Sequence, residues 1–120
     1  MMKPHIDLSK EPNYDVVWRG DIGGFNNEED WKKWFASYEK MIVKYARLSE
    51  ELKCEILSVS CELINVNHRE QEWRDIIRKI REVYSGKLVS SANHSGEEVS
   101  KNWLDAFDYI GVMLIICQEI

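Results

Sequence analysis

The clearest candidate for chemistry in the sequence is Glu62, which lies near the end of the apolar stretch from Ile56 to Leu63. This stretch predicts a buried strand, and helical patterns precede and follow it. In a parallel α/β sheet, the side chains at the carboxyl ends of the strands line the active site. Glu62 is therefore expected where a catalytic acid would lie, although the same pattern also fits a solvated residue at a strand end.

The elements that must position Glu62 alternate between strand and helix. Apolar residues that recur every three or four positions predict helices, which cover Trp31 to Leu52, Trp73 to Tyr84 and Glu97 to Ala106. The expected strands are Met2 to Leu8, Ile56 to Leu63, Lys87 to Ala92 and Phe107 to Ile116. This alternation indicates an α/β fold with a parallel sheet and right-handed crossovers, as in a doubly wound sheet or part of a (β/α)8 barrel.

Two details of the helices follow from their ends. Asn26 or Asn27 would cap the first helix, because a side-chain oxygen at this position accepts a hydrogen bond from the first turn. Gly86 would end the second helix as a left-handed cap. The tryptophans at core spacing, Trp31, Trp34 and Trp73, are assigned to packing.

Composition limits the classes of partner and cofactor. Sixteen Lys and Arg residues against 21 Asp and Glu residues give a net charge of −5, which argues against nucleic acid or an anionic membrane as the partner. The three cysteines form no C-x-x-C pair, so neither a metal site nor a disulfide framework is expected, and no cofactor is indicated. No signal peptide is visible at the start of the sequence, and the compartment stays open.

An ordered set of short segments extends from about residue 2 to residue 112. It includes Lys3-Pro4-His5-Ile6-Asp7, Trp18-Arg19-Gly20-Asp21-Ile22, the helix start from Asp30 to Tyr38, Val59-Ser60-Cys61-Glu62-Leu63, Ser91-Ala92-Asn93, and Asp108-Tyr109-Ile110-Gly111-Val112. Taken together, these segments resemble glycoside hydrolase family 113, which includes β-mannanases.

The resemblance implies a (β/α)8 barrel and a retaining hydrolase that uses two glutamates. Glu62 matches the acid/base position at the end of the fourth strand. The chain would then form one partial barrel domain over residues 1–120, with about strands three to six and three helices. A whole barrel takes about 250 residues, and the nucleophile would lie on a seventh strand outside this sequence. We therefore expect an internal fragment that is inactive alone.

The substrate implied by the resemblance is a β-linked oligosaccharide. Asn93 is expected to bind a sugar hydroxyl or the catalytic carboxylate, with a turn residue as the alternative. His5 and Asp7, at the end of the first strand, would contact sugar, although a structural histidine is also compatible with the pattern. Trp18 and Arg19, on a long loop, would supply a stacking platform and a hydroxyl contact, unless the indole is pinned under the loop.

The sequence departs from the family pattern at three places. Ser60-Cys61 replaces a Gly-Thr before the acid/base glutamate, His94 replaces a tryptophan, and residues 113–117 differ from the expected run. Two alternatives therefore stay open: a non-catalytic remnant that binds sugar or self-associates, and an independent small α/β domain. Because a partial barrel has unpaired strand edges, self-association through these edges is expected.

Overall fold

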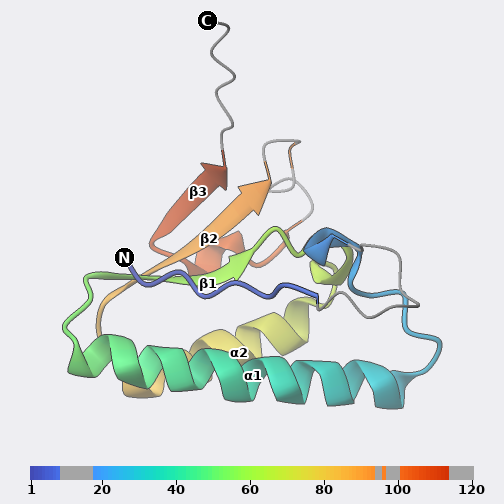
Figure 1. The fold of residues 1–120 in the computed structure, drawn as a ribbon, viewed down its shortest axis with the longest axis horizontal. Helices are drawn as coiled ribbons and strands as arrows, with labels where there is room; N and C mark the ends of the chain where they lie inside the picture. Colours follow the sequence, from blue (N-terminus) through green and yellow to red (C-terminus); the bar gives the residue numbers. More distant parts are fainter. Residues whose placement is uncertain (9–17, 94–95, 97–100, 114–120) are drawn as a thin grey trace, which may run out of the picture.

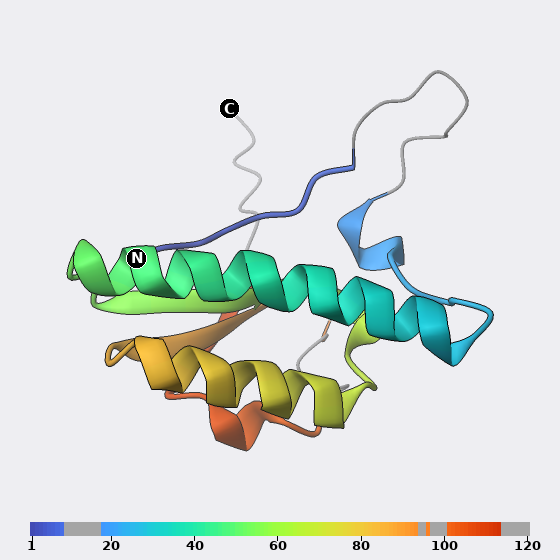
Figure 2. The same ribbon diagram turned by 90° about the horizontal axis from the view of Figure 1, so that it is seen from below.

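The computed structural model describes residues 1–8, 18–93, 96 and 101–113. Its strands, β1 (Ile56–Cys61), β2 (Lys87–Asn93) and β3 (Tyr109–Met113), form a parallel sheet in the order β1-β2-β3. Its α-helices, α1 (Glu28–Glu51) and α2 (Glu70–Val83), lie side by side on the same face of this sheet (Figures 1 and 2). A doubly wound sheet has helices on both faces, so this layering is consistent with part of a (β/α)8 barrel.

Helix α1 begins at the predicted cap. The side-chain oxygen of Asn27 accepts a hydrogen bond from the Asp30 N–H at 2.9 Å, and acidic residues fill the first turn, where they face the positive end of the helix dipole. The buried face recurs at helical spacing and consists of Trp31, Phe35, Tyr38, Ile42, Ala46 and Ser49. Neither α1 nor α2, the α-helices among the described residues, is long and apolar enough to cross a membrane.

The end of α1 places a lysine in a left-handed conformation. The N–H groups of Lys53 and Cys54 donate to the carbonyls of Glu50 and Ser49, at 3.1 and 2.9 Å, which is the hydrogen-bond pattern of a Schellman cap. Lys53 has a φ of 54°, and glycine is the residue that adopts this region without a Cβ clash. The cap is therefore formed at a backbone cost.

Replacing Lys53 with glycine is expected to raise the free energy of unfolding by about 1 kcal/mol, because the left-handed conformation then costs no Cβ strain. Urea unfolding followed by circular dichroism measures the change. The matched control is Lys44→Gly on the exposed side of α1, which should lower the same quantity by about 1 kcal/mol. Equal effects of the two glycines would contradict this account of the cap.

The core is an aromatic layer between the helices and the sheet. Trp73 of α2 is fully buried, and its ring stacks on Trp103 with 4.8 Å between the ring centroids. Both indole N–H groups donate to main-chain carbonyls, of Val66 at 2.9 Å and of Asn67 at 2.8 Å. The packing role predicted for the tryptophans is confirmed: Trp31 and Trp73 are buried in the core, and Trp34, partly buried, packs against it.

The first expected strand, Met2 to Leu8, is reduced to a single parallel bridge in the structure. Met2 pairs with Leu57: its N–H donates to the Ile56 carbonyl and its carbonyl accepts from the Ser58 N–H, both at 2.8 Å. The next donor along this ladder would be residue 4, which is a proline and has no N–H. The segment therefore runs beside β1 without forming a regular strand (Figure 1).

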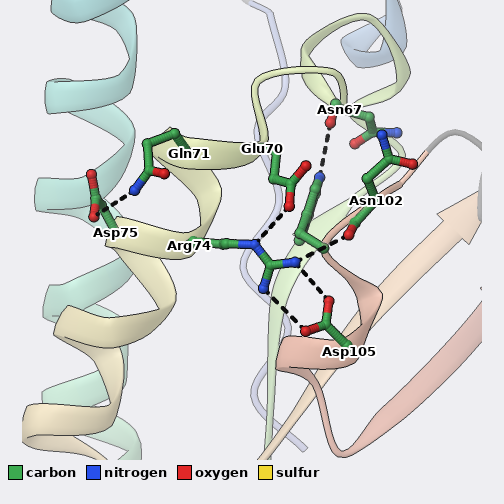
Figure 3. A network of polar contacts seen from close by, with 8 residues as sticks. Asn67, Glu70, Gln71, Arg74, Asp75, Asn102 and Asp105 are labelled. Atoms are coloured by element: carbon green, nitrogen blue, oxygen red, sulfur yellow. Dashed lines mark hydrogen bonds and ion pairs between the residues drawn. The ribbon is translucent and has the colours of Figure 1, made fainter.

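The third expected helix is also different. Residues 97–100 lie outside the described residues, and the remainder forms a short 3-10 turn at Leu104–Ala106 instead of an α-helix. The buried indole of Trp103, packed on Trp73, anchors this segment to α2. In addition, the Arg74 guanidinium donates to both oxygens of Asp105, at 2.7 and 3.2 Å, and to the Asn102 carbonyl at 3.1 Å (Figure 3).

Two further boundaries differ from the expectation. Gly86 is not a left-handed cap, because α2 ends in extended backbone at Tyr84 and Gly86 has no positive φ. A Cβ at Gly86 would overlap the phenol of Tyr84, which donates to the Cys54 carbonyl at 2.7 Å. The last strand covers Tyr109–Met113, and residues 114–116 of the expected strand lie outside the described residues.

Candidate active site

Glu62 follows directly on the last residue of β1, at the carboxyl edge of the sheet. Its backbone is held by a hydrogen bond from its N–H to the Ser91 carbonyl at 3.1 Å. Its φ of 55° lies in the left-handed region, which non-glycine residues rarely adopt and which is enriched at functional sites. A register irregularity between Ser58 and Ser60 precedes it in the strand, and such bulges redirect side chains beside active sites.

Asn93 approaches Glu62 from the neighbouring strand. The parallel register pairs Cys61 with Ser91, so Glu62 is level with Ala92, and Asn93, the last residue of β2, follows one residue further along the same edge. The side-chain amide of Asn93 donates to Glu62 Oε1 at 3.3 Å. The structure thus brings together two predicted residues that are 31 positions apart in the sequence.

Arg19 joins this pair to the N-terminal segment. It begins a 3-10 turn, Arg19–Asp21, and its Nη1 lies 3.6 Å from Glu62 Oε2. Its Nη2 donates to Asp7 Oδ1 at 2.5 Å, and its Nη1 also contacts His5 Nδ1. The five residues that meet here, His5, Asp7, Arg19, Glu62 and Asn93, are called the Glu62 cluster below. This shared ion pair through Arg19 is the part of the site that the sequence did not reveal.

The protonation state of His5 follows from these contacts. A guanidinium can only donate, so His5 Nδ1 must present its lone pair to Arg19, which requires a neutral imidazole. Partial burial, followed by the positive charge of Arg19, lowers the pKa of His5 below its usual value. The predicted sugar contact of His5 would therefore come from its other ring nitrogen.

Cys61, immediately before Glu62, is a buried thiol. Its side chain is 3% exposed, and burial is the main cause that raises its pKa above the usual value. A thiol with a raised pKa is a poor nucleophile at neutral pH. This environment is that of a small core residue and not of a nucleophile.

Trp18, the predicted stacking residue, lies next to Arg19 in the chain but outside the cluster's hydrogen bonds. Its side chain is 39% exposed, and its ring lies against Gly20, where a Cβ would overlap it. The indole is thus held by the turn and still offers exposed ring surface. His94, where the sequence departs from the family pattern, lies outside the described residues.

A separate hollow of about 730 Å³ lies between α1 and α2. Its lining includes Lys44 and Arg47 from α1 and Arg78 and Glu82 from α2, and no member of the Glu62 cluster belongs to it. It therefore lies on the helical face and not at the carboxyl edge of the sheet. Among the described residues, no group of three or more His, Cys, Asp or Glu side chains could hold a metal ion.

Comparison with solved structures yields close matches of fold. A structure described as a complex of GH113 β-1,4-mannanase superposes with a TM-score of 0.75 at 30% sequence identity, over 81% of this chain and 32% of that chain. The GH113 β-mannanase AaManA from Alicyclobacillus acidocaldarius, in complex with ManMIm, gives a TM-score of 0.74 at 35% identity, with the same coverage. No curated protein matches the sequence.

These matches cover most of this chain but only part of the proteins it resembles. The chain spans about a third of the length of the solved structures. The model of Glycoside Hydrolase Family 113 matches residues 1–117, which include every member of the Glu62 cluster. On this match, and on a fold shared with solved members at 30–35% identity, the chain belongs to glycoside hydrolase family 113.

Proposed function

We propose that this chain is the part of a retaining, β-mannanase-like glycoside hydrolase that contains the acid/base residue, and that this residue is Glu62. The observation on which the proposal depends is the arrangement of Glu62: it lies at the carboxyl end of β1 with Oε1 hydrogen-bonded by Asn93 and Oε2 facing Arg19. Catalytic residues of barrel enzymes lie at this edge. In this proposal, residues 1–120 form strands three to six of one barrel domain, with the segment before α1 as the third strand.

Retaining hydrolysis assigns Glu62 two successive tasks. As an acid it gives a proton to the departing glycosidic oxygen, and as a base it then takes a proton from the water that cleaves the glycosyl-enzyme. Because both oxygens of Glu62 have a partner in the cluster, the carboxyl group is held in one orientation toward the substrate. Fixed orientation of this kind lowers the entropic part of the barrier.

The second carboxylate of such an enzyme stands roughly 5–5.5 Å from the first and attacks the anomeric carbon. Asp7 is the carboxylate that shares Arg19 with Glu62, but the guanidinium stands between the two and binds Asp7 directly. We therefore assign Asp7, together with His5 and Trp18, to contact with sugar, and place the nucleophile on a strand beyond this chain. The chain alone would then bind a β-linked mannooligosaccharide weakly and hydrolyse none.

The test is a chimera in which this 120-residue chain replaces the matching third of a solved β-1,4-mannanase. Glu62→Gln in the chimera is expected to lower kcat/KM on β-1,4-mannan by about 10²–10⁴-fold, the usual contribution of general acid–base catalysis. Glu55→Gln, which makes the same change at the exposed residue just before the same strand, should leave the rate unchanged. A Glu62→Gln chimera as active as its parent would overturn the proposal.

A second function, self-association, is favoured by the state of β3. Within the described part of the chain no strand pairs with its outer edge, and the side chains of Tyr109 and Ile110 are 54% and 52% exposed. Unpaired edges with exposed apolar side chains recruit further strands. We expect sedimentation velocity of the 120-residue chain to show dimers or larger species, which Ile110→Lys shifts toward monomer. A monomeric parent chain across the micromolar range would contradict this expectation.

A further inference from the structure

We infer that Arg19 is a positioning residue for Glu62, and not a residue that binds a sugar hydroxyl. The inference depends on the proposed function, because it takes Glu62 as the acid/base. The sequence suggested that Arg19 contacts substrate from a loop. In the structure, however, the guanidinium is directed into the protein, and its side chain is only 16% exposed.

Three of the five N–H donors of Arg19 face protein partners. Nη1 serves His5 Nδ1 and Glu62 Oε2, and Nη2 serves Asp7 Oδ1. Two N–H groups remain, the second one of Nη2 and that of Nε; Nε is buried and meets no hydrogen-bond acceptor among the described residues, so it is not offered to a ligand at the surface. A guanidinium in this state has little capacity left for a sugar hydroxyl.

The turn that presents Arg19 is fixed at both ends. Gly20 is buried under the Trp18 ring, and the N–H of Ile22 donates to the Arg19 carbonyl at 3.2 Å. Gly23, with a φ of 137°, comes so close to the main chain of Asn65 that a Cβ would press on it. Arg19 therefore extends toward Glu62 from a backbone that is anchored to the segment after β1.

Two residues therefore position the Glu62 carboxylate, each at a different oxygen. Asn93 fixes one oxygen from β2, and Arg19 fixes the other while holding the N-terminal segment in place through Asp7 and His5. Loss of Arg19 would leave Glu62 and Asp7 no longer joined, and would free the Glu62 side chain to turn away. The rate of the chemical step would fall, and sugar binding would weaken only as far as Asp7 and His5 move when their contact with Arg19 is lost.

In the chimera, two substrates with different leaving groups distinguish a positioning role of Arg19 from a sugar-binding role. A mannooligosaccharide needs its leaving oxygen protonated, whereas a dinitrophenyl β-mannoside does not. For Arg19→Gln we expect kcat on the oligosaccharide to fall ten- to hundredfold, with a smaller change in KM and a much smaller loss in kcat/KM on the dinitrophenyl substrate. Arg19→Lys should recover little, because an ammonium cannot reproduce the guanidinium's fork.

The matched control is Arg47→Gln on the exposed side of α1, which should change neither kcat nor KM for either substrate. A rise in KM for both substrates with kcat unchanged would overturn the inference and make Arg19 a sugar contact. If Glu62→Gln abolishes oligosaccharide hydrolysis while Arg19→Gln does not lower it, the inference alone fails. If Glu62→Gln leaves the rate unchanged, the proposed function fails first.

The contact between Arg19 and Glu62 can also be tested without enzyme turnover, by NMR spectroscopy of the 120-residue chain. With ¹³C-labelled glutamate, the Glu62 carboxyl resonance is identified by its disappearance in Glu62→Gln. It should shift in Arg19→Gln and stay in place in Arg47→Gln. A resonance that Arg19→Gln leaves unmoved would overturn the inference, whatever the chimera does.

Discussion

Replacing Trp73 with alanine is expected to lower the free energy of unfolding by about 3–5 kcal/mol. The indole is fully buried, and the ring centroids of Phe35, Tyr38 and Trp103 lie 5.5, 5.2 and 4.8 Å from its own. Truncation opens a cavity between both helices and the segment before β3. It also removes the donor to the buried Val66 carbonyl. Since small domains are stable by about 5–15 kcal/mol, such a loss would unfold much of the population.

Urea unfolding of the 120-residue chain, followed by circular dichroism, measures this loss. The control is Trp18→Ala, the same truncation at an indole that is 39% exposed, which should cost no more than about 1 kcal/mol. Trp73→Phe should lower the free energy of unfolding by an amount between those of Trp73→Ala and Trp18→Ala, because it keeps most of the ring contact but loses the hydrogen bond to Val66. Similar losses at Trp73 and Trp18 would show that the aromatic layer is not the centre of stability.

Much of this core was predictable because burial leaves a periodic trace in the sequence. Trp31 and Phe35, four positions apart, fall on the same face of α1, and both are buried. The regular first strand was wrongly predicted: a proline is tolerated near the start of a strand, but here Pro4, which has no N–H, stops the ladder after Met2. The prediction of a third helix was wrong in its described part. There Trp103 stacks on Trp73, a tertiary contact that the local sequence pattern does not predict.

The site was predictable to a different extent. Glu62 and Asn93 could be placed at one edge because parallel strands end there, whereas the hydrogen bond between their side chains is known only from the structure. The ion pair with Arg19 could not be foreseen, since it depends on how a loop turns 43 positions before Glu62. The left-handed backbone of Glu62 was equally hidden, because sequence rules reserve that conformation for glycine and asparagine.

The most diagnostic test of the role of Glu62 is chemical rescue of a variant that lacks the carboxylate. In the chimera, Glu62→Ala is expected to lower the turnover of a dinitrophenyl β-mannoside by slowing the second step, because no base remains to activate water. The first step should persist, since dinitrophenolate departs without a proton. The glycosyl-enzyme should therefore accumulate, with a burst of dinitrophenolate before a slow steady state.

Azide is an anion that attacks without a general base and is small enough for the space that the carboxylate leaves. Adding it to Glu62→Ala should raise the steady-state rate by at least about tenfold, a part of the loss of about 10²–10⁴, and give β-mannosyl azide with retained configuration. The same truncation at Glu55, the exposed residue just before β1, should show neither a burst nor an azide effect. An α-configured azide product would identify Glu62 as the nucleophile, and a parent-like rate without azide would exclude it from catalysis.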